Sequence, residues 1–298
     1  MRPSHPKHPA CYARGFTLVE MVVAIVLTSI IVAATIYFVY PVRQAADLST
    51  RAELTDIADN ALQRIGRDVR LGLPNSVRVT TSGSSGFVEF LALRTAGRYR
   101  SVSSGVACLA ATDELAFDSV DTCFKSIGTV AVTDAVTNSD YLVLNNYGAG
   151  FSNQNAYETA APTVANPRNR RQISGFASEG SRHRIEFSSA VAFKAELHDS
   201  PGRRFFIISG PVSYECNTST RQLTRYSGYA IADAQPTSFG GGTLIADNVT
   251  GCEFNYDQNG VAPQIGLLTL RLTLSKTLSG GEAETVSLYH AVHVSNVP

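Results

Sequence analysis

The stretch that decides the fold is FTLVEMVVAIVLTSIIVAATIYFVY, residues 16–40. It carries one charged side chain, Glu20, and contains neither glycine nor proline. As an α-helix with a rise of about 1.5 Å per residue it extends about 37 Å, which is enough to cross the hydrocarbon core of a membrane. The stretch therefore predicts a membrane-spanning helix near the start of the chain.

Residues 1–15, MRPSHPKHPACYARG, contain Arg2, Lys7 and Arg14 and no acidic residue. Positive charge on a short flank predicts that this end stays in the cytoplasm while the rest of the chain crosses the membrane. A cleaved secretory signal peptide normally has a shorter apolar core without a charge. A plain membrane anchor leaves Glu20 unexplained, because an ionisable group in hydrocarbon is costly and usually functional.

A third interpretation accounts for both the length and the charge. The string Gly15-Phe16-Thr17-Leu18-Val19-Glu20 closely resembles the prepilin processing motif of type IV pilins and type II secretion pseudopilins. The resemblance implies that a prepilin peptidase cleaves between Gly15 and Phe16 and methylates the new amino group of Phe16. It also implies that the Glu20 carboxylate meets the amine of a neighbouring subunit during assembly. The simpler alternative is that Glu20 only reaches the membrane interface.

The charge balance of the chain limits its partners. The 25 Lys and Arg residues equal the 25 Asp and Glu residues, and removal of the three basic residues in the leader leaves 22 against 25, a balance of −3. A general nucleic-acid-binding protein usually has a strong basic excess. Nucleic acid is therefore not an expected partner.

Helical periodicity resumes after Pro41. Apolar residues recur at spacings of three and four at Leu54, Ile57, Ala58, Ala61, Leu62, Ile65 and Val69. This spacing marks one face of an amphipathic helix, and Gly72 and Pro74 are typical stop signals. We expect one helix over 16–73, with 16–40 as the transmembrane segment and fibre core and 41–73 as an amphipathic part.

Residues 74–298 are expected to form an exoplasmic, β-rich globular domain. Alternating or short apolar runs occur at 88–93, 141–144, 203–210, 212–216, 222–231, 266–276 and 284–294. In the clearest run, Leu268, Leu270, Leu272 and Leu274 share one face. Residues 146–182 are expected to form a long excursion. The predicted fold class is α+β and pilin-like, with the long helix packed on a mostly antiparallel sheet.

Four cysteines remain after removal of Cys11 with the leader. They are Cys108, Cys123, Cys216 and Cys252, all in the part expected to reach an oxidising compartment. Three pairings are possible, and we favour Cys108–Cys123 and Cys216–Cys252 because they close the shortest loops. Metal binding is the weaker alternative, since no C-x-x-C or His/Cys cluster occurs.

No catalytic constellation emerges from the sequence. On the strand expected there, His290 and His293 point to opposite faces. The glycines at 240–242 lack the lysine and helix of a phosphate-binding loop. Residues 257–260, Asp-Gln-Asn-Gly, contain the Asn259-Gly260 pair typical of a hairpin turn and resemble a calcium loop only in its first four residues. We expect no enzyme activity, no cofactor and no metal.

Arginines gather at Arg168, Arg170 and Arg171, with Arg182 and Arg184 following and Arg203-Arg204 further on. Folded together, they would suit phosphate or another anionic polymer. Only Phe176 is available nearby to stack on a base. A solvated or subunit-facing charged patch is the favoured interpretation.

Four further segments narrow the resemblance: 51–79, 210–216, 223–231 and 287–298. Together they are similar to MshO-type minor pilins of the mannose-sensitive haemagglutinin (MSHA) pilus system. That similarity implies a low-abundance subunit that primes or modifies a fibre used in attachment. The implied partners are prepilin peptidase, other pilin subunits and the inner-membrane assembly platform. The implied location is the inner membrane, with the domain in the periplasm, and then the cell-surface pilus. The alternative is a minor, tip-located pseudopilin of type II secretion.

Overall fold

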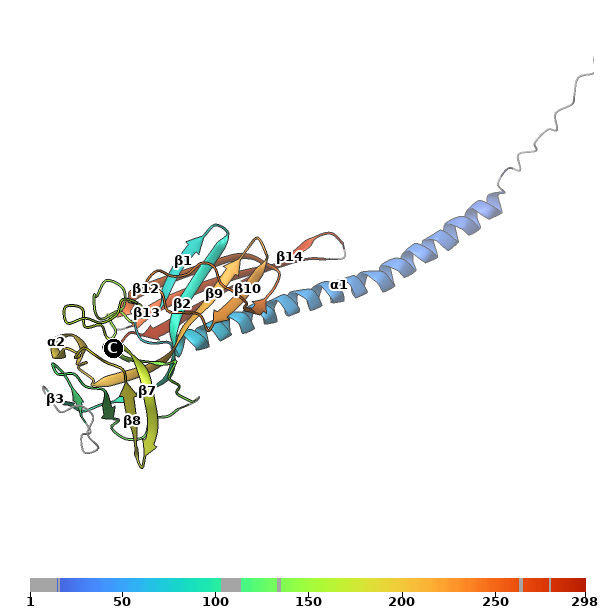
Figure 1. Cartoon of the computed structure of the whole chain (residues 1–298). Coiled ribbons are helices and arrows are strands. Elements are labelled where there is room, and N and C mark those ends of the chain that lie inside the picture. The colour runs from blue at the N-terminus through green and yellow to red at the C-terminus, as the bar shows by residue number, and fades with distance from the viewer. Residues whose placement is uncertain (1–14, 16, 103–113, 133–134, 263–264, 279) are drawn as a thin grey trace, which may run out of the picture. The chain divides into compact units, whose positions relative to one another are not determined.

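The computed structural model describes residues 15, 17–102, 114–132, 135–262, 265–278 and 280–298, without the side chains of 39–47 and 259–262. The chain divides into two compact units, Met1–Arg51 and Ala52–Pro298. The boundary between them falls inside helix α1, Leu18–Arg70 (Figure 1).

Helix α1 is continuous over 53 residues and includes Pro41. It was expected to run to residue 73 but ends at Arg70. The reason lies in the next residues: Gly72 bridges to Ala92, and the Leu73 N–H donates to the Leu91 carbonyl. The chain therefore leaves the helix to pair with a strand before the predicted stop at Pro74.

Nine strands form the large sheet in Ala52–Pro298. They are β1 (Arg78–Ser82), β2 (Ser85–Arg98), β5 (Cys123–Lys125), β6 (Tyr141–Leu144), β7 (Arg170–Glu179), β8 (Arg182–Phe187), β9 (Arg204–Asn217), β10 (Gln222–Ser227) and β11 (Thr243–Ala246). The main order is β1-β2-β9-β6-β7-β8-β5, and β10 pairs with both β9 and β11. Every pairing in this sheet is antiparallel.

A second sheet contains the three antiparallel strands β12 (Val249–Ala262), β13 (Ile265–Thr277) and β14 (Ala283–Ser295). The leucines at 268, 270, 272 and 274 are all buried, as their alternation predicts. Two short elements complete the described fold: a parallel pair, β3 (Ser101–Val102) with β4 (Leu115–Ala116), and helix α2 (Ala195–His198). The predicted α+β class, with a helix on a mostly antiparallel sheet, is confirmed.

Separate hydrophobic cores hold the Ala52–Pro298 unit together. The first joins the buried face of α1 to residues from both sheets, such as Phe90, Tyr214 and Leu270. The second includes residues of β5, β6, β7, β8 and β9 and is rich in aromatic residues, among them Phe124 and Phe205. A smaller cluster includes Leu91 and Phe206. Strands β2 and β9 contribute to more than one of these clusters.

Three details differ from the sequence expectations. Residues 146–182 are not one long excursion, because Arg170–Glu179 is a strand paired with β6 and β8. The Asn259-Gly260 pair is not the hairpin turn, because β12 continues, with an irregular register, to Ala262 opposite Ile265. The predicted runs 203–210 and 212–216 form the single strand β9. Pro211 is tolerated there because Gly210 has φ +128° and the β2–β9 register shifts nearby.

Candidate assembly site on the amino-terminal helix

The start of α1 is capped by Thr17. The Glu20 N–H donates to Thr17 Oγ1 at 3.3 Å, and the Met21 N–H donates to the Thr17 carbonyl at 3.2 Å. The spacing Thr-x-x-Glu is that of a capping box, and a carboxylate in the first helical turn interacts favourably with the helix dipole. The Thr-x-x-Glu spacing is the sequence signal from which this capping role of Thr17 could have been predicted.

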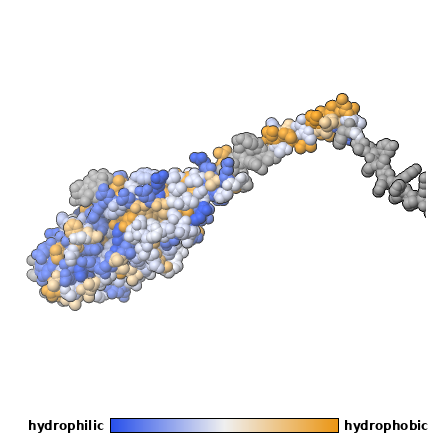
Figure 2. Space-filling view, turned by 90° about the horizontal axis from the view of Figure 1, so that it is seen from above, coloured by the Kyte–Doolittle hydropathy of each residue, from blue (hydrophilic) through white to orange (hydrophobic). Residues whose placement is uncertain are grey.

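The segment Leu18–Phe38 is long and apolar enough to cross a membrane. Its side chains are exposed throughout, so the rest of the described chain does not cover them. Orange marks such apolar residues on the space-filling view (Figure 2). An exposed apolar helix of this length needs lipid or other helices around it.

The threonine and serine hydroxyl groups in this segment donate hydrogen bonds to carbonyl groups of the helix itself. Thr28 Oγ1 donates to the Ala24 carbonyl at 2.8 Å, and Ser29 Oγ donates to the Ile25 carbonyl at 2.7 Å. Thr35 Oγ1 donates to the Ile31 carbonyl at 2.8 Å. Because these groups need no outside partner, they add little to the cost of placing the helix in hydrocarbon.

Glu20 is the one charged residue of Leu18–Phe38, and its side chain is exposed. An isolated carboxylate in hydrocarbon costs several kcal/mol, and a cationic partner would offset that cost. Gly15 is exposed as well. Phe16 lies outside the described residues, so the cleavage site itself stays a prediction.

The second part of α1 is fixed to the sheets. Its buried residues are Leu54, Ala58, Ala61, Leu62, Ile65 and Val69, and Ile57 is partly buried. Asp68 accepts a hydrogen bond from the Tyr214 hydroxyl at 2.7 Å and forms an ion pair with Arg225 at 3.0 Å. Burial, reinforced by Asp68, raises the pKa of Tyr214. The periodic apolar face predicted from the sequence is therefore the face that packs.

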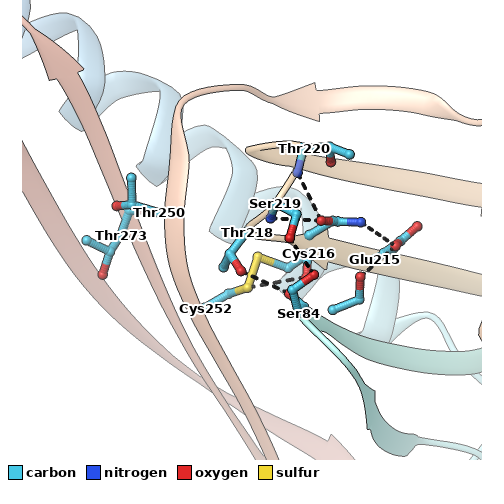
Figure 3. The surroundings of a disulfide bond; sticks show 11 residues. Ser84, Glu215, Cys216, Thr218, Ser219, Thr220, Thr250, Cys252 and Thr273 are labelled. Atoms are coloured by element: carbon cyan, nitrogen blue, oxygen red, sulfur yellow. Dashed lines mark hydrogen bonds between the residues drawn. A yellow bond between two sulfur atoms is a disulfide. The ribbon is translucent and has the colours of Figure 1, made fainter.

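A disulfide bond joins Cys216 at the end of β9 to Cys252 on β12, with the two Cα atoms 6.3 Å apart. Figure 3 shows the bond beside the turn that follows β9, where the Asn217 Oδ1 atom accepts hydrogen bonds from two backbone N–H groups. The bond connects the large sheet to the three-stranded sheet. The other predicted pair, Cys108–Cys123, stays a prediction because Cys108 lies outside the described residues.

His290 and His293 both lie on β14. His290 is half-buried near Gly66 of α1, whereas His293 is exposed. Within the described ranges, no cluster of three or more His, Cys, Asp or Glu residues could hold a metal ion.

The arginines do not form one patch. Arg168, Arg170 and Arg171 line a common cavity. Arg184, on β8, is instead paired with Glu186 at 2.8 Å. The patch expected from their proximity in the sequence is therefore divided between two sites.

Residues 11–36 match the family described as "Prokaryotic N-terminal methylation motif". No curated protein and no solved structure matches the chain significantly. The motif covers the end of the basic flank with Arg14, the Gly15–Phe16 junction and most of the exposed apolar segment. It supports a type IV pilin-like or pseudopilin subunit, which is processed by a prepilin peptidase and assembles with other pilins. Proteins of this kind are structural rather than catalytic. The apolar helix fits a single-pass anchor in the inner membrane.

Proposed function

We propose that the protein is a minor pilin-like subunit of a type IV pilus, which primes or modifies a fibre used in surface attachment. The observation that carries this proposal is the methylation motif at 11–36, placed directly at the start of an exposed apolar helix with a single charge. Residues 1–15 would be the leader, and 16–40 would first span the membrane and then enter the fibre core. Residues 74–298 would be displayed first in the periplasm and then on the cell surface.

Assembly is proposed to depend on two charged groups. Cleavage after Gly15 leaves a methylated amine on Phe16, and the Glu20 carboxylate of one subunit would pair with this amine on its neighbour. The attraction between opposite charges is strong where the dielectric constant is low. Because the threonine and serine hydroxyls of the segment are already bonded internally, the charged Glu20 carboxylate is the group that gains most from a partner.

The assignment to an MSHA-type pilus rests on the sequence alone. The four similar segments lie in the end of α1 with the following loop, in β9, in and after β10, and in β14 with the chain end. The inner-membrane assembly platform of such a system would be the further partner.

The second candidate is a minor pseudopilin of type II secretion. The same motif and the same apolar helix support it, because pseudopilins share the assembly mechanism. Neighbouring genes distinguish the two candidates, since pilus and general-secretion operons encode different partners.

Processing is tested by mass spectrometry of the mature amino terminus. The expected first residue is Phe16 with a methylated amine. An intact leader in assembled fibres, or a cut after Ala34, would contradict the proposal.

The role of Glu20 is tested by the substitution Glu20→Ala, with Glu53→Ala as the matched control elsewhere on α1. Loss of the carboxylate should leave insertion unchanged or slightly easier, by a few kcal/mol at most. Processing should also survive, because the cleavage site is intact.

Shear fractionation followed by immunoblotting measures incorporation into fibres. We expect the Glu20→Ala protein to remain in the membrane fraction and the Glu53→Ala protein to appear in sheared fibres. Wild-type incorporation of the Glu20→Ala protein would show that Glu20 is not an assembly contact.

A further inference from the structure

A cavity of about 250 Å³ opens beside the start of β7. Its charged lining residues are Arg168, Arg170, Arg171 and Glu158. Three guanidinium groups and one carboxylate give this lining a formal charge of +2. A concave surface with an excess of one charge concentrates ions of the opposite sign.

Arg171 is the most deeply placed of the three arginines, with 3% of its surface exposed. Its guanidinium donates to Ser189 Oγ at 2.9 Å and to the carbonyl oxygens of residues 167, 168, 170 and 191. All these acceptors are neutral. Burial lowers the pKa of Arg171 to about 10, so the group stays charged at neutral pH. The hydrogen bonds hold the guanidinium without neutralising it.

Arg170 has a similar environment. It donates to the Ala156 carbonyl at 2.7 Å and to the Glu158 carbonyl at 3.2 Å, and its guanidinium lies 4.9 Å from the centre of the Tyr141 ring. These contacts also fix a cation without placing a carboxylate directly against it.

Arg168 differs because it has an ion pair and an unused donor. Its NH1 group lies 2.7 Å from Glu158 Oε1, whereas its Nε–H is buried without a hydrogen-bond partner. An unpaired buried donor costs roughly 1–3 kcal/mol, so an acceptor supplied by a ligand would stabilise this group. Arg168 also has φ +47°, a conformation that non-glycine residues adopt uncommonly and that clusters at functional sites.

We propose that this arginine pocket binds a compact oxyanion, a carboxylate or phosphate group, carried by a small ligand such as an acidic sugar. Guanidinium groups match the geometry of such oxyanions through paired N–H donors. The cavity is smaller than the roughly 300–1,000 Å³ of sites for drug-sized ligands, so it suits one such group and little more. Ala160, Ala161, Pro162 and the Tyr141 ring would contact the uncharged part of the ligand.

If the three arginines only stabilised the fold, the hydrogen bonds that Arg170 and Arg171 of β7 donate to loop carbonyl groups would be explained. A purely structural role does not explain the unused Arg168 donor or the positive charge of the lining, which exceeds what Glu158 inside the cavity and Asp233 behind Thr159 offset. The two roles predict different responses to added anions.

Binding is measured on the full-length protein in detergent micelles by saturation-transfer difference NMR, with glucuronate, glucose 6-phosphate and neutral glucose as probes. The two anions should bind and glucose should not. The stronger of the two anionic probes identifies carboxylate or phosphate as the recognised group.

Three substitutions and one control test the site. Arg168→Gln should weaken anion binding about tenfold or more, the effect of losing one charged hydrogen bond. Glu158→Gln should strengthen it, because a competing carboxylate is removed. Ala161→Asp adds a negative charge on the exposed rim and should weaken binding without disturbing the packing. Arg203→Gln is the matched control, since Arg203 is exposed, has φ +49° and lies outside the cavity.

Equal binding of glucose and the anions would overturn the proposal. So would unchanged affinity in both Glu158→Gln and Ala161→Asp, even if Arg168→Gln failed to fold. Equal weakening by Arg203→Gln and Arg168→Gln would show a diffuse charge effect and also overturn it.

Discussion

The disulfide between Cys216 and Cys252 should make a large contribution to the stability of the Ala52–Pro298 unit. The perturbation is the double substitution Cys216→Ala with Cys252→Ala, which removes the bond and leaves no lone thiol at the site. Alanine is preferable to serine because Cys216 is fully buried and a hydroxyl there would lack water.

The expected magnitude follows from the loop that the bond closes. The two cysteines are 36 residues apart in sequence. In the chain-entropy treatment, a loop of that length stabilises the folded state by roughly 4 kcal/mol at 25 °C, because the unfolded chain is restricted. The bond also connects β9 to β12, so its loss removes the one disulfide cross-link between the two sheets that the described residues show.

The assay is urea unfolding of the full-length protein in detergent, followed by the near-ultraviolet circular dichroism of the buried tyrosines. Reductant is unsuitable, because it would also break the predicted Cys108–Cys123 bond. The double substitution of the exposed neighbours, Thr220→Ala with Thr250→Ala, serves as a control and should change the free energy of unfolding by less than about 0.5 kcal/mol.

A loss below about 1 kcal/mol with an unchanged urea slope would refute the reasoning. In that case the first hydrophobic core alone would hold the two sheets together.

Three further predictions concern buried groups. Glu89 is fully buried, forms an ion pair with Arg78 at 2.6 Å, and accepts hydrogen bonds from Tyr229 and Ser213. In urea unfolding, Glu89→Ala should lower the free energy of unfolding by about 3–5 kcal/mol, because Arg78 loses its carboxylate partner. A Cβ atom at position 66 would lie only 3.0 Å from His290 Nε2. The substitution Gly66→Leu should therefore lower the free energy of unfolding by about 1–3 kcal/mol or more through overpacking. The substitution Arg64→Ala, at an exposed position, should lower it little. Burial lowers the pKa of His198 to about 4, below its ordinary 6.5. The neutral side chain therefore contributes its full stability above pH 6.5 and loses it as the pH falls toward 4, by about 2 kcal/mol at pH 5. The substitution His198→Gln should remove that part of the pH dependence of the free energy of unfolding.

The elements with strong periodicity were predictable from the sequence. The three-and-four spacing from Leu54 to Val69 predicted the packed face of α1, and the alternating leucines of β13 predicted its buried face. These patterns are local, so neighbouring residues alone carry them. Strand β7 was missed because it starts with two arginines, and a register shift between Ile173 and Gly175 breaks its alternation.

The sites were predictable to different degrees. The Gly15–Phe16 junction and Glu20 are recognisable from a short local motif. The Cys216–Cys252 pair followed from loop length, since each alternative pairing closes longer loops. The arginine pocket was not predictable, because it depends on which of several nearby arginines meet Glu158 and which meet Glu179 or Glu186. Tertiary contacts decide that, and the charge pattern does not encode them.

The separate cores give the Ala52–Pro298 unit two levels of cooperativity. We expect the second core to open while α1 stays packed against the first, because α1 contributes no buried residue to the second. Backbone amides of β5, β7 and β8 should therefore exchange with deuterium through a local opening that has a lower free energy than the opening that exposes amides of Ala52–Arg70. Because the two cores are formed by different residues, we expect that related proteins can differ in sequence in the second core without altering the first core, against which α1 packs.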